Sequence, residues 1–307
     1  VYMKKISMIV LAVLLIASPL FADFNARLNE MDTLFINDKL DECRDMIDDA
    51  IEKTNDPVEL SELYWRLSRV ILSIADELEV LGAQEDELYS LFEEGEMYAD
   101  KSIELHENAP AYVYKASNIG RWGELKGPLN ALSKADPIRE TIRYVVNDLG
   151  DMDQTIGWYV IGQLYYLLPG WPISYGNQDI AISVARKAVD TIPKKMLYPG
   201  HFKALAVMLW DRNWSSSKRN SKIKSIERSW KKESDDPFEQ TYYYEGSQGV
   251  KHVPFYSSVA LNKMSDRQEA VLLLNYALAK YEAWPIHTRG DKRNKAEIDN
   301  LLKEWGF

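Results

Sequence analysis

Apolar residues recur at helical spacing along most of this chain. The clearest run has a period near 3.6 residues rather than 2, and it consists of Leu63, Leu67, Val70, Ile71, Ile74, Leu78 and Leu81. In front of this run, Asp56 is a suitable N-cap and Pro57 suits the first helical position. The pattern therefore predicts an amphipathic helix that begins near residue 57.

Similar stretches predict helices along the rest of the chain. They cover residues 26–53, 86–105, 110–120, 137–149, 153–168, 178–192, 200–212, 220–232, 266–283 and 291–305. Only Tyr242-Tyr243-Tyr244 could be extended, and it stands alone in a segment that is typical of a loop. Because no pair of strands is evident, the predicted fold class is all-α.

Two stretches carry a repeat pattern. The first helix of a tetratricopeptide repeat, W-x2-L-G-x2-Y, is matched by Trp158, Ile161, Gly162 and Tyr165. The small residues of its second helix are matched by Ala181, Ala185, Ala188 and Pro193. Small residues let two helices approach closely. Trp158 and Ala181 are farther apart than the ~16 positions of an uninterrupted repeat, so extra residues lie in the turn between Pro169 and Gln178.

Weaker copies flank this hairpin. The first-helix positions are also occupied by Phe202, Leu205, Ala206 and Leu209, followed by an insertion around 213–217. Upstream, small residues match a second helix and then a first helix, namely Gly95, Ala99, Ser102, Val113, Ala116, Ser117 and Gly120. One hairpin cannot bury its apolar face alone. The pattern therefore predicts a single domain over residues 23–307, an α-solenoid or superhelix of degenerate tetratricopeptide-like hairpins with a concave surface.

The first 22 residues have the pattern of a signal peptide. Lys4 and Lys5 precede an apolar run over residues 6–20, and Ala22 is a small residue before a plausible cleavage site. We therefore expect export to the periplasm with cleavage near Ala22. An uncleaved N-terminal anchor helix is the alternative. A lipid anchor is not expected, because no Cys lies near the cleavage site.

Composition excludes several classes of protein. The 307 residues are 46% hydrophobic and 27% charged, as in ordinary globular proteins. A single Cys, Cys43, rules out an intramolecular disulfide framework. The four His residues are too far apart in sequence for an HExxH zinc motif, and no metal or cofactor is expected. A net charge of −10 argues against nucleic acid as the partner.

Catalytic signatures are weak. The chain has no Gly-rich phosphate loop and no GxSxG nucleophile elbow. His201 is expected to be a packed or surface residue. The acidic neighbours Glu42 and Asp45 should raise the pKa of Cys43, which makes it a poor nucleophile. We therefore expect a protein that is not an enzyme.

Charge is divided unevenly along the chain. Residues 23–107 contain 25 Asp/Glu and 7 Lys/Arg, whereas residues 108–307 carry a net charge of +6. One interpretation of this uneven distribution is that the charged residues simply form solvated faces of helices. The second is a bipolar surface that orients a protein partner or closes the superhelix on itself.

Two segments are interpreted as inserted turns, each presenting a Trp among polar groups. They are residues 120–128, with Trp122, and residues 168–177, with Trp171. A rigid aromatic side chain is a common anchor for a ligand or partner. Alternatively, both Trp residues fill gaps between hairpins, or some of the aromatic residues line an apolar lumen.

The order of these motifs resembles the TatT family, the tetratricopeptide-repeat components associated with TRAP-type transporters. The likeness covers roughly residues 28–305. It is most specific from "NIGRWGELKG" through "LLPGWPISYGN" to Pro193. The resemblance implies a periplasmic all-α protein with a central pore that self-associates as a trimer. It also implies binding to the TRAP solute-binding protein and to an apolar or amphiphilic small molecule, such as a fatty or organic acid. Members are usually lipoproteins, and this sequence departs from that pattern.

These observations lead to one functional hypothesis and one alternative. The hypothesis is a periplasmic accessory of TRAP transport that docks the solute-binding protein and holds or passes an apolar molecule. Trp122 and Trp171, supported by Tyr175, would form aromatic walls or partner anchors, and Arg121 would pair with a ligand carboxylate. By its hydrogen-bonding chemistry, Asn177 is expected to cap the helix that starts near residue 178. The alternative is a non-catalytic protein–protein interaction scaffold that takes no small ligand.

Overall fold

The computed structural model describes residues 23–247 and 249–307, and every regular element in those ranges is helical. This confirms the predicted all-α class. After a helix over residues 23–36, the elements are α2 (Leu40–Ile51), α3 (Pro57–Val80), α4 (Glu85–Leu105), α5 (Ala109–Lys126), α6 (Pro128–Asn147), α7 (Thr155–Leu167), α8 (Gln178–Asp190), α9 (Pro199–Arg212), α10 (Ser216–Glu233), α11 (Pro237–Gln240), η1 (Thr241–Tyr243), η2 (Leu261–Lys263), α12 (Asp266–Glu282) and α13 (Arg289–Glu304).

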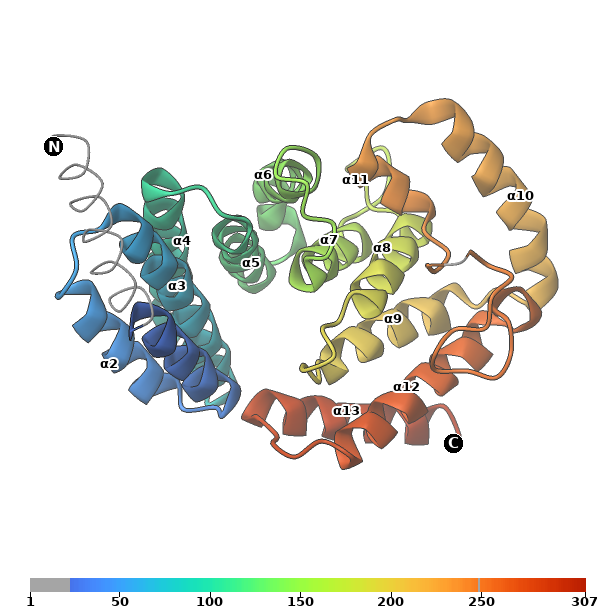
Figure 1. Cartoon of the computed structure of the whole chain (residues 1–307). Helices are drawn as coiled ribbons and strands as arrows, with labels where there is room; N and C mark the ends of the chain where they lie inside the picture. Colours follow the sequence, from blue (N-terminus) through green and yellow to red (C-terminus); the bar gives the residue numbers. More distant parts are fainter. Residues whose placement is uncertain (1–22, 248) are drawn as a thin grey trace, which may run out of the picture.

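Neighbouring helices pack as hairpins that follow one another along an arc (Figure 1). The most extensive pairings join α3 with α4, α5 with α6, and α7 with α8. A Cβ added at Gly162 of α7 would lie only 3.3 Å from the backbone nitrogen of Ala185 in α8. The predicted close approach of the Trp158 helix to the Ala181 helix is therefore confirmed.

One predicted helix is in fact two. The stretch over residues 26–53 is broken at 37–39, and Asp38 there has a left-handed backbone with φ of 62°. Asp tolerates this conformation better than most residues because its short polar side chain can form local hydrogen bonds. The break lets α2 fold back so that its buried residues, Leu40, Cys43, Ile47 and Ala50, join the apolar core formed with α3.

The prediction of an inserted turn over residues 120–128 was wrong. α5 continues to Lys126, and the chain turns only at Gly127, where φ is 84°. Gly123 packs against Ala131 of α6 instead of breaking the helix, since a Cβ there would meet that of Ala131 at 3.2 Å. α6 also begins at Pro128 rather than near residue 137. Pro137 lies inside α6 because burial of its neighbours, such as Ile138, outweighs the lost backbone hydrogen bond.

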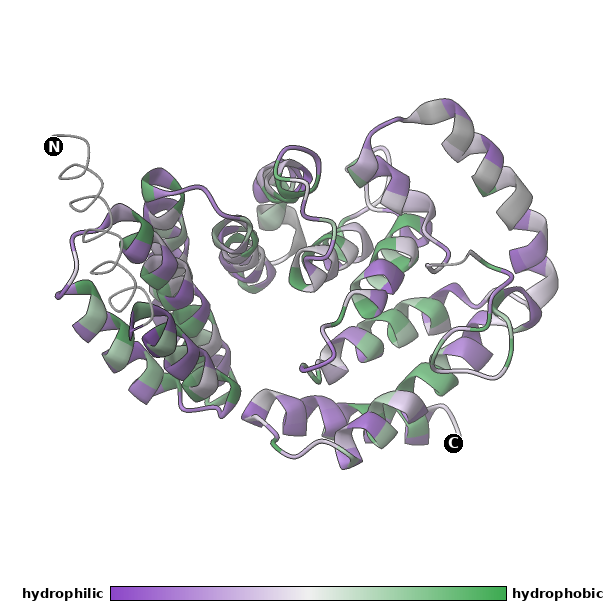
Figure 2. Ribbon diagram, viewed as in Figure 1, coloured by the Kyte–Doolittle hydropathy of each residue, from purple (hydrophilic) through white to green (hydrophobic). Residues whose placement is uncertain are grey.

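The helix that pairs with α9 is α12, not the helix that follows α9 directly. The interruption is therefore residues 213–265, much longer than the predicted insertion around 213–217. α9 and α12 meet through hydrophobic residues, whereas α13 is mostly hydrophilic (Figure 2). Among the described residues, α10 packs mainly on η1 and η2, and it forms the outer edge of the long insertion (Figure 1).

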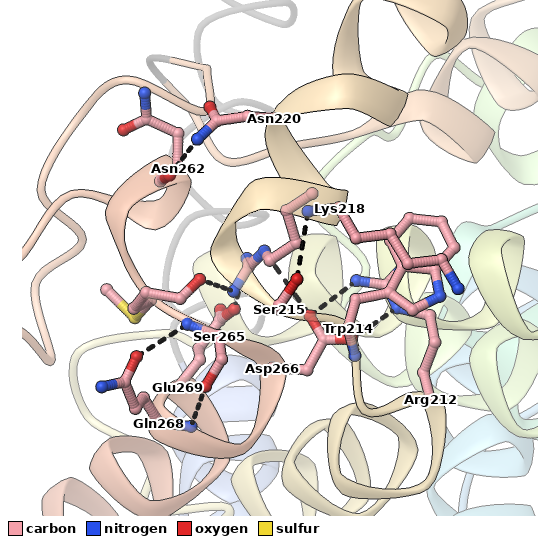
Figure 3. Close-up of polar contacts among 12 residues, drawn as sticks. Arg212, Trp214, Ser215, Lys218, Asn220, Asn262, Ser265, Asp266, Gln268 and Glu269 are labelled. Carbon is pink, nitrogen blue, oxygen red and sulfur yellow. Dashed lines mark hydrogen bonds and ion pairs between the residues drawn. The ribbon is translucent and has the colours of Figure 1, made fainter.

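A buried ionic cluster attaches the insertion to the α8, α9 and α12 helices, and Figure 3 shows its part around Asp266 and Glu269. Arg186 donates to both carboxylate oxygens of Glu269 at 2.9 Å, and Arg219 of α10 donates to the same carboxylate at 2.6 Å. Arg212 binds Asp266 through two nitrogens, at 2.8 and 2.9 Å. The carboxylates of Asp266 and Glu269 are fully buried.

The C-terminal helix returns to the N-terminal part of the chain through a group of ion pairs that we name the clasp: Asp38, Glu77, Arg289 and Arg293. Both the backbone N–H and the Nε of Arg289 donate to Asp38, at 2.9 and 2.8 Å. Two nitrogens of Arg293 bind Glu77 at 2.8 and 2.7 Å. These contacts close the arc into a ring (Figure 1).

No helix among the described residues is both long and apolar enough to cross a bilayer. The predicted signal peptide, residues 1–22, lies outside the described residues.

Candidate ligand-binding cavity

A cavity of about 640 Å³ lies among α3, α5, α6, α7 and α9. Four of these are the first helices of successive hairpins, and the fifth is α6. Most of the wall is apolar, formed by Leu72, Ala131, Ile138, Ile156, Val160, Leu164, Leu167, Leu168, Ala204 and Val207. The volume and the apolar lining both match those of small-molecule binding sites.

Gly120 of α5 contributes open space to this cavity. A Cβ built on Gly120 would meet no atom within 4 Å, although the residue lies in the cavity wall and within a helix. The glycine is therefore needed neither for a turn nor for close helix packing. It leaves room that a larger side chain would fill.

One end of the cavity is charged, and Arg121 lies at its centre. The Nε of Arg121 donates to Asp76 at 2.8 Å, and its other two nitrogens pair with Glu79 and Glu124. Burial works to lower the pKa of Arg121, but these carboxylates outweigh it and raise the pKa above its ordinary value. Three carboxylates around one guanidinium leave this end negative, so it disfavours the hypothesised pairing of Arg121 with a ligand carboxylate.

Lys134 of α6 is better placed than Arg121 to bind an anionic group in the cavity. Its Nζ lies 5.3 Å from the centroid of the Trp122 ring, and it has no carboxylate partner within the described ranges. Lys203, which also lines the cavity, pairs with Glu297 of α13. An anionic group in the cavity would therefore meet Lys134 more readily than Arg121.

Trp122 lies beside the cavity rather than in its wall. The residue packs with the buried apolar cluster of Ala75, Leu88 and Phe92, and its indole N–H donates to Glu93 at 3.2 Å. Trp122 therefore fills a gap between helices. It adjoins the cavity only by way of Lys134, whose Nζ lies close to the Trp122 ring.

Trp171 and Tyr175 lie in the loop between α7 and α8, where an insertion was predicted. Trp171 is 90% exposed. Tyr175 packs edge-on against Tyr165 at 5.5 Å, with the Arg139 guanidinium 4.6 Å from its ring centroid. Neither residue lines the cavity. Of the four residues predicted for the site, the structure thus places only Arg121 in the wall.

The predicted cap at Asn177 is confirmed, since its side-chain oxygen accepts from the backbone N–H of Asp179 at 2.9 Å and of Ile180 at 3.2 Å. This cap fixes where the loop ends and α8 begins.

A stack of aromatic rings supports the cavity from behind. Tyr159, which lines the cavity, stacks on His201 at 4.5 Å, and His201 stacks on Tyr198 at 5.0 Å. Burial lowers the pKa of His201 to about 3, so the imidazole is neutral. Gln163 donates to the Tyr159 hydroxyl at 3.0 Å.

Cys43 is buried in the N-terminal core, and burial raises the pKa of its thiol to about 11. The direction agrees with the prediction, but the main cause is burial rather than the flanking acids. Within the described ranges, no group of three or more His, Cys, Asp or Glu residues is placed to hold a metal ion.

Sequence reasoning did not identify Lys134 or the role of Gly120. Lys134 precedes the predicted start of its helix, and Gly120 was placed both at the end of a predicted helix and at the start of a predicted inserted turn. Comparison with known proteins adds no name, because no family model and no curated protein matches this chain.

Proposed function

We propose that this chain is an exported, non-catalytic solenoid of degenerate tetratricopeptide hairpins that serves a TRAP-type transporter. It holds an amphiphilic molecule in the cavity and docks the solute-binding protein. The cavity carries the proposal, since its volume is about 640 Å³, its wall is largely apolar, and Lys134 has no carboxylate partner among the residues that the structure describes. The order of motifs between residues 118 and 193, which resembles TatT proteins, supports the link to TRAP transport.

The test of the cavity uses two substitutions at one residue. Gly120→Phe places a ring in the open space, so we expect binding of dodecanoate, measured by calorimetry, to weaken at least tenfold. Gly120→Ala is the matched control. It should retain binding and stabilise the protein by about 0.5–1 kcal/mol, because alanine favours the helix. Unchanged binding by a folded Gly120→Phe protein would contradict the proposal.

The docking part of the proposal rests on Trp171. An indole that is 90% exposed contributes little to the fold, so Trp171→Ala should leave the melting temperature within about 1 °C. We expect it to weaken binding of the cognate solute-binding protein, measured by surface plasmon resonance. Equal affinity of the variant and the wild type would remove Trp171 from the interface.

The alternative, an interaction scaffold without a small ligand, also agrees with an exposed Trp171. Native mass spectrometry of gently purified protein separates the two. A bound small molecule supports the carrier, whereas repeated absence, together with no binding of dodecanoate, favours the scaffold.

A further inference from the structure

A second cavity, of about 350 Å³, lies between α8 and the long insertion. Its wall is formed by residues of α8, α10, α11 and η1 and by the loop that follows η1. No described residue lines both this cavity and the larger one. Small-molecule sites have volumes of about 300–1,000 Å³, so the second cavity fits a ligand at the small end of that range.

The wall contains a carboxylate whose charge is poorly compensated. Glu245, with a side chain that is 21% exposed, contacts Arg186 at 3.5 Å, whereas Arg186 donates to both oxygens of Glu269 at 2.9 Å. Burial raises the pKa of Glu245, even though Arg186, Arg219 and Arg212 oppose this shift. A further cation beside Glu245 would therefore stabilise its charged form.

Aromatic rings lie in the same wall as this carboxylate. Tyr244 directly precedes Glu245, and its hydroxyl donates to Asp190 of α8 at 2.8 Å, which holds the ring in place. Trp230 of α10 also lines the cavity. The faces of Tyr and Trp rings attract cations. A carboxylate beside such rings is a combination suited to an organic ammonium group.

A weakly paired cation lines the cavity as well. The Nζ of Lys187 lies 5.6 Å from the centroid of the Tyr244 ring, and its ion pair with Asp153 is long, at 3.8 Å. Because the Asp153 side chain is 86% exposed, this pair is weak and leaves Lys187 able to bind an anionic group. The indole N–H of Trp230 is buried without a hydrogen-bond partner in the part of the chain that the structure describes, and a ligand acceptor would supply one.

We propose that the second cavity binds a small zwitterion of the class of free aliphatic amino acids, with its ammonium group at Glu245 and its carboxylate at Lys187. A zwitterion satisfies both weakly paired charges, whereas a ligand with one charge leaves the other without a partner. The wall also contains apolar residues that suit an aliphatic side chain, namely Met152, Ile226, Pro237 and Val250. This inference goes beyond the proposed function and does not depend on a ligand in the larger cavity.

Three ligands that share one aliphatic chain test the class of ligand. L-leucine carries both charges, isopentylamine lacks the carboxylate, and isocaproate lacks the ammonium group. In isothermal titration calorimetry of the full chain, leucine should bind at least tenfold more tightly than either analogue. Saturating leucine should leave the binding of dodecanoate unchanged, because the two cavities share no described wall residue.

Two substitutions test which residue binds which end of the ligand. Glu245→Gln should weaken the binding of leucine at least tenfold and remove its advantage over isocaproate. Lys187→Gln should weaken the binding of leucine and remove its advantage over isopentylamine. Lys194→Gln and Glu282→Gln are matched controls at exposed residues outside the wall, and they should leave leucine binding unchanged.

Circular dichroism establishes that each variant is folded, and the comparison of the three ligands on the wild type needs no variant. Absence of leucine binding at millimolar concentration would overturn the proposal. Equal affinity of the wild type for leucine and either analogue would do the same, as would competition between leucine and dodecanoate. Unchanged leucine binding by folded Lys187→Gln or Glu245→Gln would also contradict it.

Discussion

The N-terminal and C-terminal parts of the ring bury charge to very different extents. In the N-terminal part, Asp32 binds Arg66 and Arg69, but its side chain remains 30% exposed. In the C-terminal part, Glu269 binds Arg186 and Arg219 with a side chain that is 0% exposed. Water therefore reaches the first group of ion pairs and is excluded from the second.

The difference follows from how each part is connected. The N-terminal helices are joined by short turns, so apolar packing between neighbours in sequence is enough to place them. The α9–α12 hairpin must form across residues 213–265, where many other pairings are available. Buried ion pairs add little net stability over apolar residues, but they penalise any arrangement that leaves a charge unpaired. We infer that the ionic cluster selects the correct pairing of α9 with α12.

The largest expected effect comes from removing the central acid of this cluster. Glu269→Gln removes the closest countercharge of the buried Arg186 and Arg219, which keep only the longer 3.5 Å contacts with Glu245 and Asp266. We expect a loss of about 3–5 kcal/mol in the free energy of unfolding in urea. Asp32→Asn is the counterpart in the N-terminal part and should cost about 1–2 kcal/mol, because water reaches the Asp32 carboxylate and Arg66 keeps its ion pair with Glu62. Equal losses of stability in the two variants would show that the difference in burial between the two groups of ion pairs does not affect their energetic contribution.

Acid should affect the C-terminal part first. Burial lowers the pKa of His201 to about 3, below its ordinary 6.5, so the folded state binds fewer protons than the unfolded state. The stability from neutral His201 is complete above pH 6.5 and falls by roughly 1.4 kcal/mol per pH unit below it. Urea titrations of His201→Phe between pH 7 and 5 should lose this slope.

Protonation of Glu269 should lower the free energy of unfolding separately, at a lower pH than protonation of His201. Burial opposes its ionisation, but Arg186 and Arg219 outweigh burial and hold its pKa at about 2. Its contribution is therefore lost only as the pH falls from about 4.5 towards 2. A slope between pH 7 and 5 that persists in His201→Phe would contradict the assignment to the histidine.

The smallest expected effect is at the clasp, which joins the two parts. The Arg293 side chain is 31% exposed, so Arg293→Gln should cost less than about 1 kcal/mol in global stability. Hydrogen exchange should nevertheless increase in the first turns of α13. Lys295→Gln, which breaks only the exposed pair with Asp299, is the control and should leave exchange unchanged.

Local patterns predicted the parts of the fold that depend on neighbours in sequence. Trp158, Gly162 and Ala185 identified the α7–α8 hairpin because their contacts lie within one repeat. The partner of α9 was not predicted, because α12 follows a long insertion and no local pattern links the two helices. The cluster around Glu269 was missed for the same reason, since its arginines come from α8 and α10.

The cavity was less predictable than the fold. The sequence identified Arg121 as a candidate but gave no sign of the three carboxylates around it, because Asp76 and Glu79 come from another hairpin. It also placed Gly120 at the start of an inserted turn. Whether a glycine ends a helix or opens space beside it depends on what packs against it, and that is set by tertiary structure.

The clasp also constrains the order in which the ring is completed during synthesis. Glu77 and Arg293 are 216 positions apart in the chain. At the usual ribosomal rate of about 5–20 residues per second, Glu77 exists for roughly 10–40 s before its partner is made. The first hairpins must therefore persist as an open fragment, and their own apolar core has to hold them until the last helix arrives.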